Sequence, residues 1–161
     1  MAGEIVNVGK SRWRMALENF MAQELALTTA AAFTGAAVYL GVAEQPARLG
    51  LDNTSLLAEW KPSYARGFAM QASLALASAL FGILAFWLIR DWRWLVGALL
   101  IFANWPYTLI VILPVNKRLE TTSPDAANAE TRSLIERWGT LHAGRSVLGA
   151  AATLVYLWAM A

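Results

Sequence analysis

The sequence of 161 residues contains no cysteine and a single histidine. Without cysteine the chain has no disulfide framework, no thiolate metal site and no cysteine nucleophile. One histidine cannot form a multi-histidine metal site within one chain, and the spacing supports neither a carboxylate metal site nor a haem. No glycine-rich phosphate loop and no serine nucleophile elbow is present. We therefore predict neither a metal nor another cofactor.

Charge is also scarce, because only 15% of the residues are charged and the net charge is only +2. The basic residues are scattered between apolar segments rather than gathered into a stripe that follows phosphates, so we do not expect nucleic acid as a partner. What the chain has instead is apolar material, since 58% of it is hydrophobic and it contains eight tryptophans. A water-soluble domain of this length rarely carries so much, which indicates a membrane protein with the lipid bilayer as its partner.

Four windows without charged side chains divide the chain. A charge at the bilayer centre costs about 2.5 kcal/mol or more, and a helix needs about 20 apolar residues to span. The windows predict an all-α fold, a four-transmembrane-helix bundle that forms one domain over residues 1–161. The expected spans are approximately 24–43, 67–89, 94–113 and 142–160. Helical spacing of Leu134, Trp138 and Leu141 predicts that the last helix already begins near Glu130.

The segments between the windows predict the topology. Only Arg90 to Arg93 separate the second and third spans, which favours a tight antiparallel hairpin. The connections after the first and third spans, 44–66 and 117–137, are longer and emerge together on the other side. Ser123 followed by Pro124 is typical of a helix start.

The N-terminal basic residues Lys10, Arg12 and Arg14 precede an apolar stretch that is too long for the core of a signal peptide. We interpret this stretch as a retained first helix. The dense positive charge beside it and at Arg90 and Arg93 favours a cytoplasmic location for both termini, although the total numbers of Lys and Arg favour neither side.

The one histidine lies in a stripe with two other large polar or aromatic side chains. Trp138, His142 and Arg145 fall at i, i+4 and i+7, and Gly149 and Ala152 continue the same helix face. Small residues below an imidazole and a guanidinium can leave space for a flat ligand between helices. The alternative is that His142 and Arg145 mark where the helix enters the membrane, with the arginine reaching the headgroups and the small residues allowing close packing.

The third span carries two prolines and a set of polar side chains. Pro106 removes a backbone donor and displaces the carbonyl of Phe102, so it predicts a kink. Asn104 and Thr108 can repair such a kink, or the kink can open a pocket lined by polar and aromatic groups. The candidate ligand-binding residues of this span are Asn104, Trp105, Tyr107, Thr108 and Asn116.

The first span offers two further features. Glu44 and Arg48 lie at its end, where Glu44 can pair with Arg48 as an ordinary surface ion pair, or with Arg145 if the long connections fold over the same end. We include both among the candidate binding residues. Thr28, Ala32, Gly35 and Tyr39 form a face that we interpret as packing surface.

Four segments together resemble the anthrone oxygenase-like family of bacteria and fungi over about residues 25–160. They are AEQPARL at 43–49, WKPSY at 60–64, NWPYTLIVILPVNKRL at 104–119 and RWGTLHAGR at 137–145. The resemblance implies a small protein of a bacterial inner membrane that oxidises anthrones to anthraquinones without an evident metal or flavin, with molecular oxygen as co-substrate. A hydrophobic aromatic small molecule would then be its partner.

Family chemistry of this kind assigns roles to the candidate residues. The doubly benzylic C–H of an anthrone is acidic, so a general base can produce a carbanion that passes an electron to oxygen. His142 is the candidate base, because imidazole titrates near neutral pH. Arg145 would stabilise the developing anion, Asn104, Tyr107 and Asn116 would hold oxygens, and Trp105 and Trp138 would stack on the rings.

Two other classes of function fit the same residues. The bundle can be a non-catalytic protein that binds a lipid, quinone or hydrophobic metabolite, or an accessory subunit of a membrane complex. Transport ranks last, because four spans without an inverted repeat make a poor carrier unless the chain forms a homo-oligomer, which the sequence leaves open.

Overall fold

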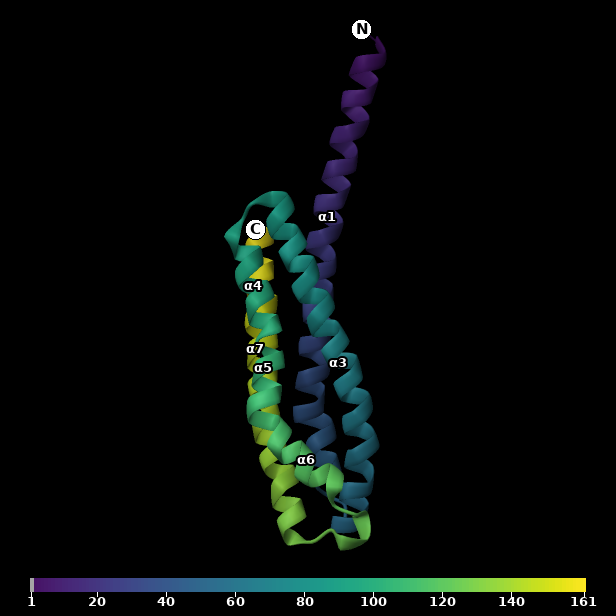
Figure 1. Cartoon of the computed structure of the whole chain (residues 1–161), viewed down its shortest axis with the longest axis vertical. Helices are drawn as coiled ribbons and strands as arrows, with labels where there is room; N and C mark the ends of the chain where they lie inside the picture. The colour runs from purple at the N-terminus through teal and green to yellow at the C-terminus, as the bar shows by residue number, and fades with distance from the viewer. Residues whose placement is uncertain (1) are drawn as a thin grey trace.

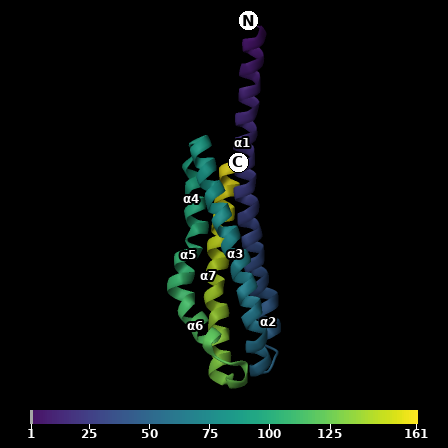
Figure 2. The same cartoon turned by 45° about the vertical axis from the view of Figure 1, so that its right-hand side comes forward.

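The computed structural model of the chain describes the backbone of residues 2–161 and the side chains of residues 17–161. The described residues contain helices and turns but no strand, so the predicted all-α class is confirmed. Four helical columns run side by side (Figure 1, Figure 2). In chain order the elements are α1 (Ala2–Tyr39), the π-helix η1 (Leu40–Glu44), α2 (Gln45–Arg48), α3 (Asn53–Ile89), α4 (Trp92–Phe102), α5 (Asn104–Tyr107), the π-helix η2 (Thr108–Ile112), α6 (Leu113–Thr121), the 3₁₀-helix η3 (Pro124–Ala126) and α7 (Ala129–Met160).

Each column is long and apolar enough to cross a bilayer. The four stretches are Leu17–Arg48, Asn53–Ile89, Trp92–Thr121 and Ala129–Met160. Large apolar side chains cover their outer faces, as Ile110 and Val147 show with exposures of 74% and 68%. In water such a surface would be unfavourable, whereas in a bilayer it contacts lipid tails. The chain is therefore an integral membrane protein with four spans. The predicted bounds of the spans within these longer helices stay a prediction.

The chain reverses direction between α3 and α4 at a two-residue turn. Arg90 takes the left-handed conformation, with φ of 63°, and ends α3. Asp91 begins α4 by accepting the backbone N–H of Arg93 at 3.0 Å. The hydrogen bond from the Arg93 side chain also holds the pKa of Asp91 below its ordinary value. This hairpin and both termini lie at one end of the bundle, as predicted, and α1 extends beyond the other columns there (Figure 1).

The two other connections lie together at the opposite end (Figure 1), and both are longer than the hairpin turn. They are shorter than the predicted 44–66 and 117–137, because helices continue past the apolar windows. Asp52 caps α3 by accepting the backbone N–H groups of Thr54 and Ser55, so this helix begins well before Arg66. Only residues 49–52 and 122–128 lie between the columns at this end.

The predicted helix start at Ser123 is correct only for a short turn. Ser123 precedes η3, which has three residues, and its side chain makes no capping hydrogen bond. The long helix α7 begins later, at Ala129, because Asn128 and Thr131 form a reciprocal capping box there.

Hydrogen bonds tie this end of the bundle together, and we call residues 44–63 and 117–137 the loop end. Arg132 of α7 donates to the carbonyls of Leu49 and Leu51 and to the side chain of Asn53. Lys61 of α3 donates to the carbonyls of Glu120 and Thr122 at 2.9 and 2.6 Å. These side chains satisfy carbonyls that a helix end leaves without partners.

The face of α1 that packs into the bundle differs from the predicted one. Its buried residues are Ala22, Ala26, Ala30, Phe33 and Ala37. Thr28, Ala32, Gly35 and Tyr39 are exposed on the opposite side, and no side chain lies within 4 Å of a methyl group placed on Gly35. The interpretation of that face as packing surface within the chain is therefore wrong. Small residues occur on both faces, so composition alone could not distinguish them.

Candidate functional site

The stripe predicted on α7 faces into the bundle. Trp138, His142 and Arg145 are only 2%, 2% and 6% exposed, and Gly149 and Ala152 are buried along the same face. Their burial contradicts the alternative in which the arginine reaches out to headgroups. Arg145 lies about 12 Å along α7 from Arg137 at 1.5 Å per residue. The predicted span 142–160 begins three residues before it.

An aromatic cluster surrounds the imidazole, and we call it the imidazole cluster: Trp60, Tyr64, Trp138 and His142. Trp138 stacks on His142 at 5.0 Å between ring centroids, and Trp60 meets Trp138 edge to face at 5.6 Å. Trp60 in turn stacks on Tyr64 at 4.8 Å with the two rings almost parallel. The helix α3 supplies two of these rings and α7 supplies the other two.

Several polar atoms of this cluster have no hydrogen-bond partner. Within residues 17–161, neither ring nitrogen of His142 is hydrogen-bonded, and neither are the indole N–H groups of Trp60 and Trp138. Asn116 of α6 is fully buried and donates its Nδ2 to the Tyr64 hydroxyl at 3.0 Å, while its Oδ1 remains without a partner. Buried polar atoms are nearly always paired in proteins, so such a concentration marks a site that can bind polar atoms of a ligand.

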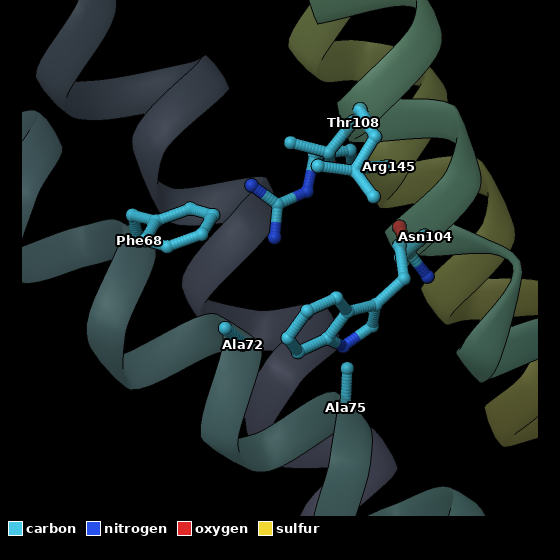
Figure 3. Close-up of a pocket in the computed structure, with 8 residues that line it drawn as sticks. Phe68, Ala72, Ala75, Asn104, Thr108 and Arg145 are labelled. Carbon is cyan, nitrogen blue, oxygen red and sulfur yellow. The ribbon is translucent and has the colours of Figure 1, made fainter. Parts of the chain in front are cut away.

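A pocket lies next to this cluster, between α3, α5 and α7, and we call it the arginine pocket. Its lining residues are Phe68, Ala72, Ala75, Asn104, Trp105, Thr108, Leu109 and Arg145. Figure 3 shows the Arg145 guanidinium reaching across from α7 towards Phe68 on α3, with Thr108 and Asn104 on the facing helix. The hollow measures about 290 Å³ with its open mouth included, but the space that the centre of a water molecule can occupy is only about 20 Å³. The hollow as it stands therefore holds about one water molecule.

A break in the third column shapes this pocket. The helix is interrupted at Ala103, three residues before Pro106. Asn104 repairs the break by donating its Nδ2 to the carbonyl of Ile101 at 3.0 Å, rather than to the carbonyl of Phe102 that the proline position suggested. Its Oδ1 is buried and has no partner. The Nδ2 of Asn104 therefore bonds to the backbone at the break, and its Oδ1 is available to a ligand in the arginine pocket.

Below the break, the column continues through Tyr107 into η2. Tyr107 donates its hydroxyl to the carbonyl of Leu141 at 2.8 Å, which joins this column to α7. The approach is close because Gly144 has no side chain, and a Cβ there would collide with the Tyr107 ring. Thr108 is buried and lines the arginine pocket.

Glu44 and Arg48 lie apart from the arginine pocket, in a network at the loop end. Arg48 is ion-paired with Glu44 and with Glu59, the latter at 3.1 Å, and it also donates to the Ser63 hydroxyl. Its guanidinium carbon lies 5.8 Å from the centre of the Trp138 ring. Glu44 thus pairs with Arg48 and not with Arg145.

Arg145, in contrast, pairs with no carboxylate of residues 17–161. Its guanidinium carbon lies 5.4 Å from the centre of the Phe33 ring, and its Nε has no hydrogen-bond partner. The positive charge is therefore held against an aromatic ring and faces the arginine pocket.

The predicted residues thus fall into three groups. Asn104, Trp105, Thr108 and Arg145 line the arginine pocket, Trp138 and His142 belong to the imidazole cluster with Asn116 beside it, and Glu44 and Arg48 belong to the loop-end network. His142 does not line the pocket. Tyr107 lies between the groups, with its hydroxyl bonded to the backbone.

Sequence reasoning missed the contribution of α3. Trp60, Tyr64 and Phe68 recur every four residues, and their rings contact one another at 4.8 and 6.0 Å. That aromatic spacing was a signal for an inward face, as was the WKPSY segment itself. No group of three or more potential metal ligands occurs among the described residues.

Comparison with known families identifies the chain. The family model described as anthrone oxygenase matches residues 60–155, which is more than half of the chain. The chain therefore belongs to the anthrone oxygenase family. The match includes the imidazole cluster and the arginine pocket, but it is narrower than the expected 25–160 and leaves out Glu44 and Arg48. No curated protein and no solved structure matches the chain.

Proposed function

We propose that this member of the anthrone oxygenase family is a small membrane oxygenase that oxidises a flat hydrophobic aromatic of the anthrone type to a quinone. Molecular oxygen is the co-substrate, and no cofactor takes part. The observation that carries the proposal is the buried imidazole of His142, which stacks on Trp138 and has no protein partner at either ring nitrogen. A histidine kept for structure would be hydrogen-bonded in this surrounding.

The reaction balances without an additional reductant. A base removes a proton from the doubly benzylic carbon, and the resulting carbanion gives an electron to oxygen, after which the two radicals combine to form a peroxide. Loss of water from the peroxide then gives the second carbonyl. One anthrone and one oxygen molecule yield one quinone and one water.

His142 is the base in this scheme and Arg145 the electrostatic partner. A free ring nitrogen can accept the carbon-bound proton, because no protein donor occupies it. The guanidinium of Arg145, three residues further along the same helix, has no carboxylate beside it and can stabilise negative charge that develops on substrate oxygen. Asn104 and Asn116 each hold an unpartnered Oδ1 that can accept a substrate hydroxyl.

Binding requires side chains to move, because the arginine pocket as it stands holds about one water molecule. Phe68 is 39% exposed at the pocket and is the wall that can swing outward. A substrate bound there would place its polar edge at Arg145, and the same movement must open a path to His142, which lies three residues away on α7 outside the pocket lining.

The test is turnover of an anthrone by the purified protein in lipid nanodiscs, followed by oxygen consumption and quinone absorbance. We expect His142→Ala to lower turnover about 100-fold or more, because general-base catalysis typically contributes that much. Thr140→Ala is the matched control, since Thr140 is exposed on the same helix. Full turnover by a monodisperse His142→Ala protein would exclude His142 as the base.

A second candidate function is non-catalytic binding of a lipid, quinone or hydrophobic metabolite, or an accessory role in a membrane complex. The absence of His142 from the lining of the arginine pocket favours it, because a molecule held in that pocket need not meet the proposed base. Mass spectrometry of molecules that copurify with the protein, combined with oxygen consumption, distinguishes the two. Retention of an aromatic ligand without oxygen consumption would support the second candidate.

A further inference from the structure

The arginine pocket contains a buried positive charge that the protein itself does not neutralise. Arg145 is 6% exposed and lies in a membrane-spanning column, yet no carboxylate of residues 17–161 pairs with it. Taking a charge out of water is costly unless an opposite charge and hydrogen bonds compensate. Phe33 offers its ring to one side of the guanidinium, which leaves the donor N–H groups for the pocket.

Further polar atoms of the pocket are free for a ligand. The Oδ1 of Asn104 is an acceptor without a partner, and the side chain is 2% exposed. The indole N–H of Trp105 is a donor without a partner. Together with Arg145, the pocket presents two sets of donors and one acceptor, which suits an ionised oxygen with a hydroxyl next to it.

The mouth of the pocket is apolar and lies on the outer face of the bundle. Leu109 and Phe68 are 53% and 39% exposed at its rim, and Ala72 and Ala75 form its floor on α3. Figure 3 shows Phe68 opposite Arg145, with Ala72 and Ala75 below. Because this face of the columns contacts lipid tails, a ligand that is already dissolved in the membrane reaches the pocket sideways, with its apolar rings between the two helices.

We propose that the arginine pocket selects an anionic aromatic: the substrate carries an ionised carboxylate or phenolate oxygen in its ground state, and Arg145 binds that oxygen. This inference rests on the proposed function, which supplies the flat aromatic substrate, and it adds that this substrate is negatively charged. It differs from stabilisation of a transient carbanion, because the preference already appears in equilibrium binding. Flat neutral aromatics are then poor ligands.

The experiment compares two fluorescent probes of the same shape, anthracene-2-carboxylate and anthracene-2-carboxamide, in zwitterionic phosphatidylcholine nanodiscs. We expect the carboxylate to bind about tenfold more tightly or better, since a charge-assisted hydrogen-bond pair contributes at least that factor. Arg145→Gln should reduce the preference to within about twofold, and Arg145→Lys should retain part of it. Arg137→Gln, an exposed arginine of the same helix, should leave it unchanged.

Three outcomes overturn the inference. One is equal binding of the two probes to the unmodified protein, and another is a preference that survives in a monodisperse Arg145→Gln variant. The third is displacement of the carboxylate by added phosphatidylglycerol in an Arg145-dependent manner, which would identify the occupant as a lipid headgroup.

Turnover, measured separately, keeps this inference distinct from the proposed function. If the protein prefers the carboxylate probe but consumes no oxygen with any anthrone, the proposed oxygenase function is wrong and the anion site is supported. If it oxidises a neutral anthrone rapidly but binds both probes equally, the anion site is wrong and the oxygenase function is supported.

Discussion

Arg48 and Arg145 are both buried, but they differ in what surrounds their charge. Arg48 sits at the loop end with the carboxylates of Glu44 and Glu59 and with the Ser63 hydroxyl. Arg145 sits in the middle of α7 with the ring of Phe33 on one side and the arginine pocket on the other. The family match covers Arg145 and stops short of Arg48.

The comparison teaches how to separate structural from functional charges in this bundle. A buried arginine with two acidic partners is neutralised by its own chain, and its removal damages the fold. A buried arginine without an acidic partner contributes little to folding and is available to a ligand. Glu44 and Arg48 therefore hold the loop end together in the structure described, and their role in binding stays a prediction.

Loss of Arg48 should have the largest effect on stability. Arg48→Leu leaves two carboxylates without their counter-ion, and we expect a loss of about 2 to 3 kcal/mol, at or below the range for fully buried pairs because Glu44 and Glu59 are partly exposed. The measurement is chemical unfolding in detergent followed by tryptophan fluorescence. Arg137→Leu, at an exposed position, is the control and should change stability by less than about 0.5 kcal/mol. Equal effects of both variants would contradict a structural role for Arg48.

Near the arginine pocket the helices are held by close packing and not by ion pairs, so adding a methyl group at Gly144 should lower stability. In Gly144→Ala the new Cβ meets the ring of Tyr107, and we expect a loss of about 1 to 2 kcal/mol from overpacking. Gly35→Ala is the matched control, because nothing lies within 4 Å of the added methyl. That variant should be neutral or more stable by up to about 1 kcal/mol, since alanine favours helix. A stable Gly144→Ala protein would show that this contact is loose.

Replacement of Arg145 should have a smaller effect, and one of opposite sign to that of Arg48. Arg145→Leu removes an uncompensated charge from the bundle, so we expect stability to stay the same or rise by up to about 1 kcal/mol without ligand. Unfolding under the conditions used for Arg48→Leu makes the two directly comparable. A loss of stability similar to that of Arg48→Leu would mean that another group of the protein neutralises the charge of Arg145.

The smallest expected effect is a change in how stability depends on pH, and it concerns Asp52 at the loop end. Hydrogen bonding by Ser55 lowers the pKa of Asp52 below its ordinary value. The cap therefore stabilises the fold above the pKa of the unfolded chain and loses this contribution as the pH falls through the lower, folded pKa. Asp52→Asn keeps the cap but removes the titration. Its stability should depend less on pH between about 5 and 2 than that of the unmodified protein, and identical profiles would contradict this role.

The fold could be predicted because the rule behind it is local. A charge in a bilayer core is costly, so the three charges at Arg90, Asp91 and Arg93 indicated a turn, and the uncharged windows indicated helices. The start of α3 was less predictable, because Asp52 caps this helix well before its apolar window begins. The start of α7 at Ala129 agrees with the helical spacing, which predicted a start near Glu130.

The site could be predicted only in part. Periodicity correctly placed Trp138, His142 and Arg145 on one inward face, because three residues of one helix have a fixed angular relation. It could not show that Trp60 and Tyr64 of α3 fill the space beside His142, or that Glu59 neutralises Arg48. Such contacts depend on the rotation of one helix against another, which a single sequence does not specify.

The two π-helices η1 and η2 give this bundle a built-in tolerance for changes in chain length. In η1 the N–H of Gln45 bonds to Leu40, and in η2 the N–H of Leu113 bonds to Thr108, so each turn accommodates one more residue than an α-turn. Deleting one residue of η2 would therefore restore an α-turn and leave Leu113–Thr121 facing the same way, so Asn116 would still reach Tyr64. The same deletion in the regular helix α4 would instead rotate all residues after it by about 100°.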